Sequence, residues 1–471
     1  MTTFDDHLAV VLARCVPGFT ELLGAERLSA GASQETYRIT LVADGVASVL
    51  AMRRAAGGVS EKPDDSRPGL PVEAELMRVA KAAGVPEPQI IEVLDPADGL
   101  GLGFIMEWLD GETLGSRILR SDELAEVRPK LAFECGEILA RIHAIDPHKT
   151  GLAEHLTIVP TEDFVRRMWE QYHEFATPQP MIDFTARWLL DHLPPESEPR
   201  LVHNDFRNGN FMVTADGINA VLDWEVAHLG DPIRDLGWIC TNSWRFGNRD
   251  LPVGGFGELA DLLDGYESVS GSRVSEDHVQ FWEVFGSFWW AIGCLNMAHH
   301  WRTGPDQTVE RPGIARRSSE CQVDCVNLLI PGPVTVVEPS TPASSTDTPS
   351  VEELLTSVSD FLRNDLRTSI DGRNGFLSLV ASNSLEIAKR ELTLGPAHLA
   401  AEHSRLETLL STSADIESLR WQLTDGLRSG EIALDAPGLH DHLRSTVVNQ
   451  VAIDQPRYSG LAAALAGGQL D

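Results

Sequence analysis

The sequence is short of positive charge. Its 38 lysines and arginines stand against 70 aspartates and glutamates, so the formal net charge at pH 7 is −32. Binding to nucleic acid or to an anionic membrane surface needs a cationic surplus that offsets phosphate charge, and this chain has none. We therefore expect neither a nucleic acid nor a membrane as partner. The ordinary consequence of such a charge is a well-solvated acidic surface.

Paired cysteines and long apolar runs are also missing. Six cysteines are present, but no two form a CxxC pair, which argues against a disulfide framework or a zinc site and favours a reducing cytoplasm. The most apolar stretch, 281–297, contains Glu283 and is short for a membrane span, so we expect a core helix there. The opening MTTFDDHLAV has no basic segment before an apolar core, so no signal peptide is expected.

Length and composition predict several domains. A chain of 471 residues is long for one compact core. Residues 331–350, PGPVTVVEPSTPASSTDTPS, have no apolar periodicity and predict a flexible linker. Residues 351–471 show apolar positions at helical spacing and predict a separate bundle of four or five helices. The region's histidines lie on expected helix surface and do not favour a metal site: His398, His403, His440 and His442.

Before the linker, strand signals give way to helix signals. Residues 1–107 predict a small β-rich N-terminal lobe, in which two hairpins have one helix inserted between them. Residues 108–330 predict a helical lobe. The expected fold class is therefore α+β with two lobes, followed by an all-α bundle. After a first helix within 1–27, the expected N-lobe strands are 28–42, 48–53, 90–94 and 103–107 around a helix at 72–83, and the later helices are 131–144, 162–174, 181–193, 257–266, 278–297 and 314–329.

The segment from His203 to Trp224, HNDFRNGNFMVTADGINAVLDW, combines polar residues with two short strands. Strands over 211–214 and 218–222 flank an Asp-Gly pair, which is typical of a hairpin turn. Because the open ends of a hairpin lie side by side, the residues just outside the two strands should face one another. Those residues are Asn210 and Asp223.

An amide oxygen beside a carboxylate is a partial shell of the hard oxygen ligands that Mg²⁺ prefers. Asn210 and Asp223 are therefore candidate metal ligands. Asp205, on the loop that leads into the hairpin, is placed to take the proton of an attacking hydroxyl. An ordinary polar loop followed by an ordinary hairpin is the alternative interpretation.

The spacing H-x-D-x-x-x-x-N at 203–210, followed by Asp223, resembles the catalytic loop and metal carboxylate of kinase-like phosphotransferases. With LDWE at 222–225, LGDP at 229–232 and DLGW at 235–238, the chain resembles the aminoglycoside phosphotransferase/choline kinase-type family. It is nearest the branch that also occurs as the kinase-like domain of certain acyl-CoA dehydrogenase family proteins. The bundle after the linker resembles an uncharacterised helical domain sometimes found with such phosphotransferases.

This resemblance implies a bilobal protein-kinase-like fold, ATP and Mg²⁺ as cofactors, and phosphate transfer to a hydroxyl of a small molecule. It assigns proton acceptance to Asp205. His203 and Asp235 would brace the catalytic loop. Glu225 is either a supporting group behind the metal site or an exposed acid, and the sequence leaves both open.

The resemblance also implies which residues bind the nucleotide, from their positions in the sequence. Residues 28–37 stand where the phosphate-covering loop belongs, so the backbone of Gly31 and the hydroxyl of Ser33 are expected near phosphate. On the next strand arginine stands where lysine is frequent. Arg53 is the first choice for the phosphate-binding cation, and Arg54, on the opposite strand face, is the second.

The helix at 72–83 should supply the carboxylate partner of that arginine, and Glu75 is preferred to Glu73. Adenine is expected to bond to backbone groups near Glu107 and Leu109, where the lobes connect.

The family branch suggests a hydroxyacyl-CoA or related metabolite, with an aminoglycoside or amino-alcohol kinase, or a catalytically silent kinase-fold adaptor, as alternatives. A protein partner or a second copy of the chain is expected, if anywhere, at the helical bundle of 351–471. Residues expected near the acceptor are Trp244, Arg245, Phe246, Trp282, Phe285, Trp289, Trp290, Arg316 and Arg317.

Overall fold

The computed structural model describes residues 3–28, 34–58, 67–304, 307–340 and 348–467. The chain folds into two compact units. Unit 1 comprises Met1–Pro160, Pro195–Cys240 and Leu251–Trp282, and unit 2 comprises Thr161–Pro194, Thr241–Asp250 and Glu283–Asp471. Each unit is described by itself below.

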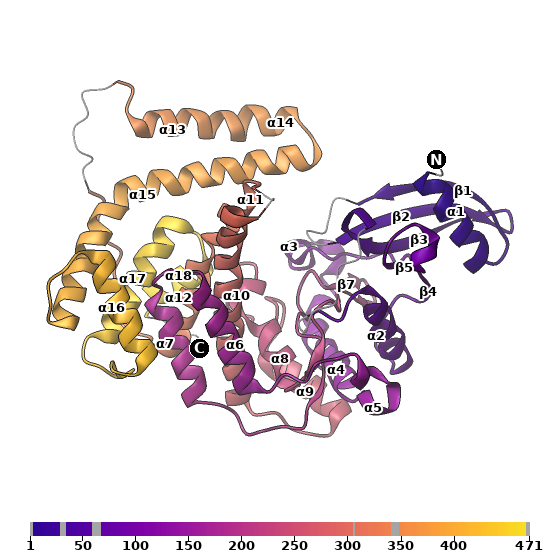
Figure 1. The fold of residues 1–471 in the computed structure, drawn as a ribbon, viewed down its shortest axis with the longest axis horizontal. Helices are drawn as coiled ribbons and strands as arrows, with labels where there is room; N and C mark the ends of the chain where they lie inside the picture. Colours follow the sequence, from indigo (N-terminus) through magenta and orange to yellow (C-terminus); the bar gives the residue numbers. More distant parts are fainter. Residues whose placement is uncertain (1–2, 29–33, 59–66, 305–306, 341–347, 468–471) are drawn as a thin grey trace. The chain divides into compact units, whose positions relative to one another are not determined.

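Unit 1 begins with a five-stranded antiparallel sheet in the order β1-β2-β3-β5-β4 (Figure 1). Helix α1 (Phe4–Cys15) packs Leu8, Val11 and Leu12 into the apolar cluster on this sheet. The predicted strand content is confirmed with one omission, β1. That strand lies at the sheet edge, has two register irregularities and shows no strict in–out alternation, so it lacks the period-2 signal of a strand. The strands are β1 Phe19–Arg27, β2 Gln34–Ala43, β3 Val46–Ala55, β4 Ile90–Val93 and β5 Gly103–Glu107.

The remainder of unit 1 is mainly helical, with two small two-stranded sheets. These sheets pair β6 (Arg200–Val202) with β9 (His228–Gly230) and β7 (Phe211–Thr214) with β8 (Gly217–Val221). The helices are α1 Phe4–Cys15, α2 Leu70–Ala82, α3 Gly115–Ile118, α4 Leu131–His143, α5 Pro147–Thr150, α8 Ile233–Cys240, α9 Leu259–Ser270 and the part of α10 (Glu276–Thr303) up to Trp282.

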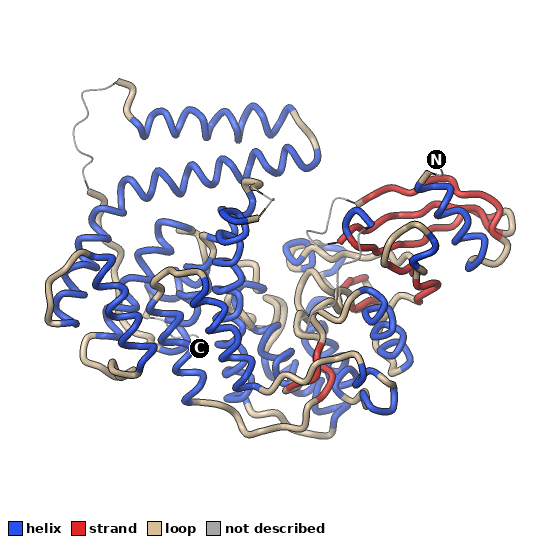
Figure 2. The backbone as a smooth tube through the Cα atoms, viewed as in Figure 1, coloured by secondary structure: helices blue, strands red, loops and turns tan. Residues whose placement is uncertain are grey.

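Unit 2 is built from helices (Figure 2). Its apolar cluster joins α7 and α12 to the helices after residue 400, so the expected bundle of 351–471 shares one core with earlier helices. Its helices, besides the rest of α10, are α6 Thr161–Glu174, α7 Pro180–Asp191, α11 Glu310–Ala315, α12 Ser318–Leu329, α13 Val351–Asp360, α14 Arg367–Ser369, α15 Gly372–Leu410, α16 Ile416–Ser429, α17 Leu439–Asp454 and α18 Ser459–Leu465.

The first half of the expected linker has neither helix nor strand from Pro331 to Ser340, yet it is anchored to unit 2. The amide of Val337 donates to Asn449 Oδ1 at 2.7 Å, and the amide of Ser340 donates to the carbonyl of Thr393 at 2.9 Å. Low helix propensity therefore does not prevent fixed contacts here.

Among the described residues, no helix combines the length and the apolar composition that crossing a membrane requires. The apolar stretch at 281–297 lies within α10, where Phe281, Phe285 and Phe288 are buried. The expectation of a core helix at this place is confirmed.

Candidate active site

The hairpin expected after residue 210 is present. Phe211 pairs with Val221 and Thr214 with Gly217. The amide of Leu222 also donates to the carbonyl of Asn210 at 2.7 Å, which extends the pairing by one step. Asn210 and Asp223 therefore flank the open end of one hairpin, as the sequence predicts.

Asp205 lies at this hairpin end and receives hydrogen bonds from three side chains. Trp238 Nε1 donates to Oδ1 at 2.8 Å, and the amide group of Asn210 donates to Oδ2. Arg207 forks across both oxygens at 2.9 and 3.2 Å. The side chain of Asp205 is 18% exposed, so the carboxylate is held in place while part of it still faces solvent.

His203 and Asp235 hold the backbone of the loop that carries Asp205. Asp235 is fully buried and accepts from the backbone amides of His203 (2.9 Å) and Asn204 (2.7 Å). His203 Nε2 contacts the carbonyl of Leu222 at 3.1 Å, and its Nδ1 accepts from the amide of Asp205 at 3.3 Å. One imidazole therefore ties the loop to the end of the hairpin, consistent with the bracing role expected for it.

The shifted pKa values of His203 and Asp235 favour, at neutral pH, the protonation states that these hydrogen bonds need. Burial lowers the pKa of His203, so the neutral imidazole that donates at Nε2 and accepts at Nδ1 is favoured. Burial raises the pKa of Asp235, but the hydrogen bond with His143 and the hydrogen bond from the backbone amide of His203 act in the opposite direction, and the net shift is downward. The carboxylate that holds the loop therefore stays ionised.

On the opposite side of the site, Arg53 lies between two carboxylates. Its guanidinium contacts Asp223 and lies 3.2 Å from Glu73 Oε1. Burial lowers the pKa of Arg53, but Glu73 and Asp223 outweigh burial and raise it overall. The N-lobe cation and the expected metal carboxylate thus meet directly.

Arg54 points to the other face of β3, as alternation along a strand requires. It pairs with Glu35 at 2.7 Å and donates to the carbonyl of Leu100 at 3.1 Å. Of the two arginines, only Arg53 contacts residues of the candidate site.

The preference for Glu75 as partner of Arg53 is wrong, because Glu73 occupies that place. Helix α2 begins at Leu70, and its buried face carries Glu73, Ala74 and Met77. Glu75 faces outward, with a side chain that is 46% exposed and an ion pair to Arg78 at 3.5 Å. Burial raises the pKa of Glu73 to about 7, although Arg53 acts in the opposite direction.

Two expected nucleotide contacts lie outside the described residues: Gly31 and Ser33. Glu107 ends β5, and Leu109 follows two residues later; both are partly buried. The backbone amide of Glu107 donates to the carbonyl of Gln89 at 2.8 Å. That amide is therefore already engaged, and a base at this position would have to use other backbone groups.

Three residues of the site do not stand out in the sequence. Gln34, at the start of β2, accepts from Arg53 and donates to Glu225 Oε2 at 3.3 Å, so Glu225 belongs to the same network. Arg207 and Trp238 hold Asp205. A usable signal exists for Trp238, because it ends the DLGW motif, whereas Gln34 and Arg207 carry no distinctive pattern.

The residues expected near an acceptor are mostly packed or paired. Trp282 and Phe285 are buried core residues, and Phe246 is 39% exposed. Arg245 is buried and pairs with Glu283 at 2.6 Å.

Comparison with known proteins identifies the family. Residues 24–271 match the model of the phosphotransferase enzyme family, and residues 368–458 match a domain of unknown function, DUF6285. The chain is 29% identical over 275 residues to acyl-CoA dehydrogenase family member 11 of Gallus gallus, covering 55% of this chain and 33% of that protein. It is 30% identical over 175 residues to family member 10 of Mus musculus, covering 36% of this chain and 16% of that protein. The chain thus spans a third or less of these relatives.

A solved structure of a candidate aminoglycoside phosphotransferase from Ralstonia eutropha shares the fold, with a TM-score of 0.55 and 22% sequence identity. The alignment covers 67% of this chain and 95% of that one. The expected kinase-like fold is confirmed. With a family model that matches more than half of its residues, the chain belongs to the phosphotransferase enzyme family and is a kinase-like phosphotransferase.

Proposed function

We propose that this protein transfers the γ-phosphate of ATP to a hydroxyl group of a small molecule, with Asp205, Asn210 and Asp223 as its working residues. The observation that supports this most directly is the hydrogen bond between Asn210 and Asp205 at the open end of the hairpin that also carries Asp223. Phosphoryl transfer needs a hydroxyl-orienting carboxylate close to hard oxygen ligands, and this hairpin end carries both.

Asp205 orients the hydroxyl and receives its proton. Both of its oxygens already accept hydrogen bonds, so an incoming hydroxyl has to share or displace one donor. Trp238 and Asn210 are both buried. Arg207, with 24% of its side chain exposed, is the donor that can move with least cost. We therefore assign Arg207 the role of holding Asp205 until the acceptor arrives.

The amide oxygen of Asn210 and the carboxylate of Asp223 fit Mg²⁺ by donor type. The described residues contain no group of three or more His, Cys, Asp or Glu side chains that could hold a metal ion. Two protein oxygens suit an ion that arrives with a nucleotide and takes its other ligands from phosphate and water. Bound there, Mg²⁺ supplies neutralisation of phosphate charge.

Arg53 binds a phosphate group in this proposal. Glu73 holds the guanidinium from one side while Asp223 contacts it from the other. A phosphate group would compete with Asp223 for the same cation, so nucleotide binding releases Asp223 for the metal. Arginine suits this task because its planar fork matches phosphate oxygens.

For the acceptor we propose a hydroxyacyl-CoA or related metabolite. The support is that the curated relatives reported above are named acyl-CoA dehydrogenase family members. Aminoglycosides and amino alcohols are the alternative acceptors, and the Ralstonia structure keeps the former open. We place the reaction in the cytoplasm, since all six cysteines are free.

The test is ATP consumption by the purified chain with Mg²⁺ and a panel of hydroxyacyl-CoAs, aminoglycosides, amino alcohols and sugars, together with thermal shifts for each. Turnover with one class identifies the acceptor. Stabilisation by ATP–Mg²⁺ without turnover on any class would favour a silent kinase-fold adaptor over an enzyme.

A further inference from the structure

Unit 2 contains a cavity of about 540 Å³ that is rich in arginine. It is bounded by α11, by the π-helical turn Phe361–Leu366, by α15 and by the loop after α17. Its wall carries Arg316, Arg317, Arg363, Arg390 and Arg457. In a chain with a net charge of −32, a concentration of cations at one cavity is unexpected.

The acidic residues of the same wall do not neutralise this excess, because each already has a cationic partner. Two of the pairs join wall residues to one another: Arg317 with Glu320 at 3.0 Å and Arg316 with Asp454 at 2.6 Å. The other two wall carboxylates pair with cations that do not line the cavity. These are Glu310 with Arg373 at 2.5 Å and Glu386 with Lys389 at 3.4 Å.

Three wall arginines have no ion pair among the described residues. Arg363 donates to Ser382 Oγ at 3.1 Å and to Asn383 Oδ1 at 3.0 Å. Arg390 donates to the carbonyls of Ile453 and Asp454 at 2.5 and 3.2 Å. Arg457 is exposed. Neutral oxygens orient two of these guanidinium groups, and none of the three groups forms an ion pair with a described carboxylate.

The electrostatics at Arg390 agree with this geometry. Burial is the largest influence and lowers the pKa of Arg390. Glu386 and Asp454 act to raise the pKa, whereas Arg457 and Arg316 lower it further. Positive charges thus repel one another at this cavity, and an anion would relieve that repulsion.

One side of the cavity is apolar. Phe376, Val380 and Ile387 line it from α15, and Phe376 is 52% exposed despite its size. An exposed aromatic ring beside oriented guanidinium groups suits a ligand with an anionic head and an apolar body. The volume lies within the range of about 300–1,000 Å³ that is usual for small-molecule sites.

We propose that this cavity binds a small organic phosphate, with the phosphate on Arg363, Arg390 and Arg457 and the apolar group on Phe376. Several guanidinium groups without a carboxylate partner favour a doubly charged phosphate over a singly charged carboxylate. The planar guanidinium can also bond to two phosphate oxygens at once. This site is independent of the proposed phosphoryl transfer, because none of the residues that carry that function lines the cavity.

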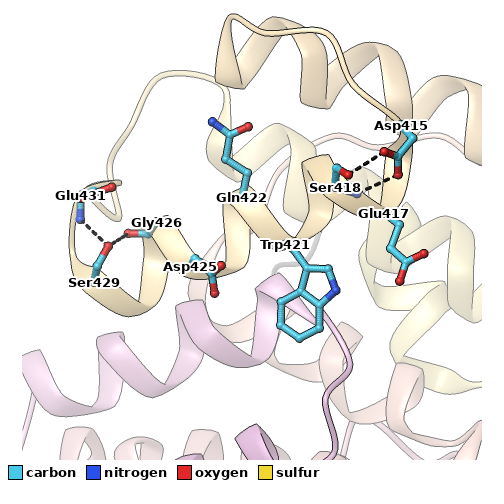
Figure 3. A pocket seen from close by; sticks show the side chains of 9 residues that line it. All are labelled: Asp415, Glu417, Ser418, Trp421, Gln422, Asp425, Gly426, Ser429 and Glu431. Carbon is cyan, nitrogen blue, oxygen red and sulfur yellow. Dashed lines mark hydrogen bonds between the residues drawn. The ribbon is translucent and has the colours of Figure 1, made fainter.

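A second cavity of unit 2 has the opposite character. A cavity of about 800 Å³ on α16 is lined by Asp415, Glu417, Asp425 and Glu431 (Figure 3). Asp415 caps the helix by accepting from Ser418, so its carboxylate has a structural role. This cavity has the same sign of charge as the whole chain.

The proposal is tested by calorimetric titration of the full chain with phenyl phosphate, inorganic phosphate and phenol. Phenyl phosphate should bind more tightly than either of the others, because it alone of the three contacts both the arginines and the apolar side of the cavity. Arg390→Gln and Arg363→Gln should each weaken phenyl phosphate binding by about tenfold or more, as expected for one lost charged hydrogen-bonding group. Phe376→Ala should weaken phenyl phosphate and leave inorganic phosphate unchanged.

Two matched variants make the test decisive. Arg367→Gln removes the same charge from an exposed position of α14 that does not line the cavity, and it should bind phenyl phosphate like the wild type. Arg53→Gln removes the cation of the proposed nucleotide site and should also leave this binding unchanged. If Arg390→Gln does not fold, Arg457→Gln replaces it, since that exposed side chain has no hydrogen-bond partner among the described residues.

Loss of phenyl phosphate binding in Arg53→Gln but not in the cavity variants would overturn the proposal and place the phosphate in unit 1. Equal binding by the wild type and all cavity variants, or no binding by the wild type at millimolar ligand, would also overturn it. Failure of the phosphoryl-transfer assay would have no bearing on these titrations.

Discussion

Arg53 in unit 1 and two arginines of the cavity in unit 2 stand in opposite electrostatic settings. In unit 1, Arg53 contacts one carboxylate from α2 and another from the end of the β7–β8 hairpin. In unit 2, the hydrogen bonds of Arg363 and Arg390 to other described residues go only to neutral oxygens. A guanidinium that already holds two acids binds a new anion only by exchange. One without an acid binds an anion by simple addition.

This difference suits the two proposed tasks. In the proposed function, exchange at Arg53 would couple nucleotide binding to the freeing of Asp223, which now pairs with it. Addition at the arginine-rich cavity needs no such rearrangement. Whether an arginine already pairs with a carboxylate therefore predicts whether an anionic ligand binds to it by exchange or by addition.

The largest effect is expected on turnover in unit 1. Asp205→Ala and Asp223→Ala should each lower kcat by about 10²–10⁴-fold, because one removes the proposed proton acceptor and the other a proposed metal ligand. Both proteins should stay folded, as judged by far-UV circular dichroism and thermal melting. Asp216→Ala, in the exposed hairpin turn, is the matched control. Ordinary turnover by the Asp205 variant would remove that residue from the mechanism.

The next effect concerns stability in unit 2. Arg420 forks onto Glu402 with Nε at 2.7 Å from Oε1, and the Glu402 side chain is only 3% exposed. Arg420→Gln should lower the free energy of unfolding by about 3 kcal/mol, since it leaves a carboxylate buried without its cation. Arg363→Gln, which breaks no ion pair, should change stability by less than about 1 kcal/mol. Urea unfolding measures the free energy of unfolding of both variants. Similar decreases in the two would mean that the ion pair of Arg420 adds no stability beyond that of the neutral hydrogen bonds of Arg363.

A smaller, pH-dependent effect is expected at Glu73. Its pKa is raised from 4.5 to about 7 by burial, so between these values the folded chain keeps a proton that the unfolded chain has lost. Stability from this group is therefore present below pH 4.5 and is lost as pH rises through 7. Glu73→Gln cannot titrate, so it should gain about 1–3 kcal/mol relative to wild type between pH 5 and pH 8.

Urea unfolding at the two pH values measures this gain. Glu75→Gln, two residues away on the exposed face of α2, is the matched control. If both variants changed in parallel with pH, burial of Glu73 would not be the cause.

The sequence predicts what depends on neighbours in the chain. The β7–β8 hairpin follows from an Asp-Gly turn between two short strands, so the placement of Asn210 and Asp223 can be worked out from local geometry. The choice between Glu73 and Glu75 cannot be worked out from local geometry. It depends on which face of α2 packs inward, and that is set by contacts with residues far away in the chain.

The arginine-rich cavity lies beyond sequence reasoning for the same reason. Arg363, Arg390 and Arg457 come from three separate segments, and nothing local indicates that they share a wall. The sequence offers Arg316 and Arg317 as candidates for an anion, yet both are neutralised by carboxylates that only the fold brings near.

Helix α15 gives the last and smallest prediction. A proline inside a helical pattern usually ends or kinks the helix, but Gly372–Leu410 is one helix with Pro396 inside it. Proline lacks the amide that would bond to the carbonyl of Leu392, and Pro396 is exposed, so no packing requires its ring.

Pro396→Ala restores that hydrogen bond. The intrinsic gain of up to about 3 kcal/mol is reduced by the greater freedom of the unfolded chain and by any adjustment that the helix has already made, so we expect about 1–2 kcal/mol of added stability. Thermal melting would show it as a higher Tm. A lower Tm would mean that the proline helps to seat α15 against α17 and α11.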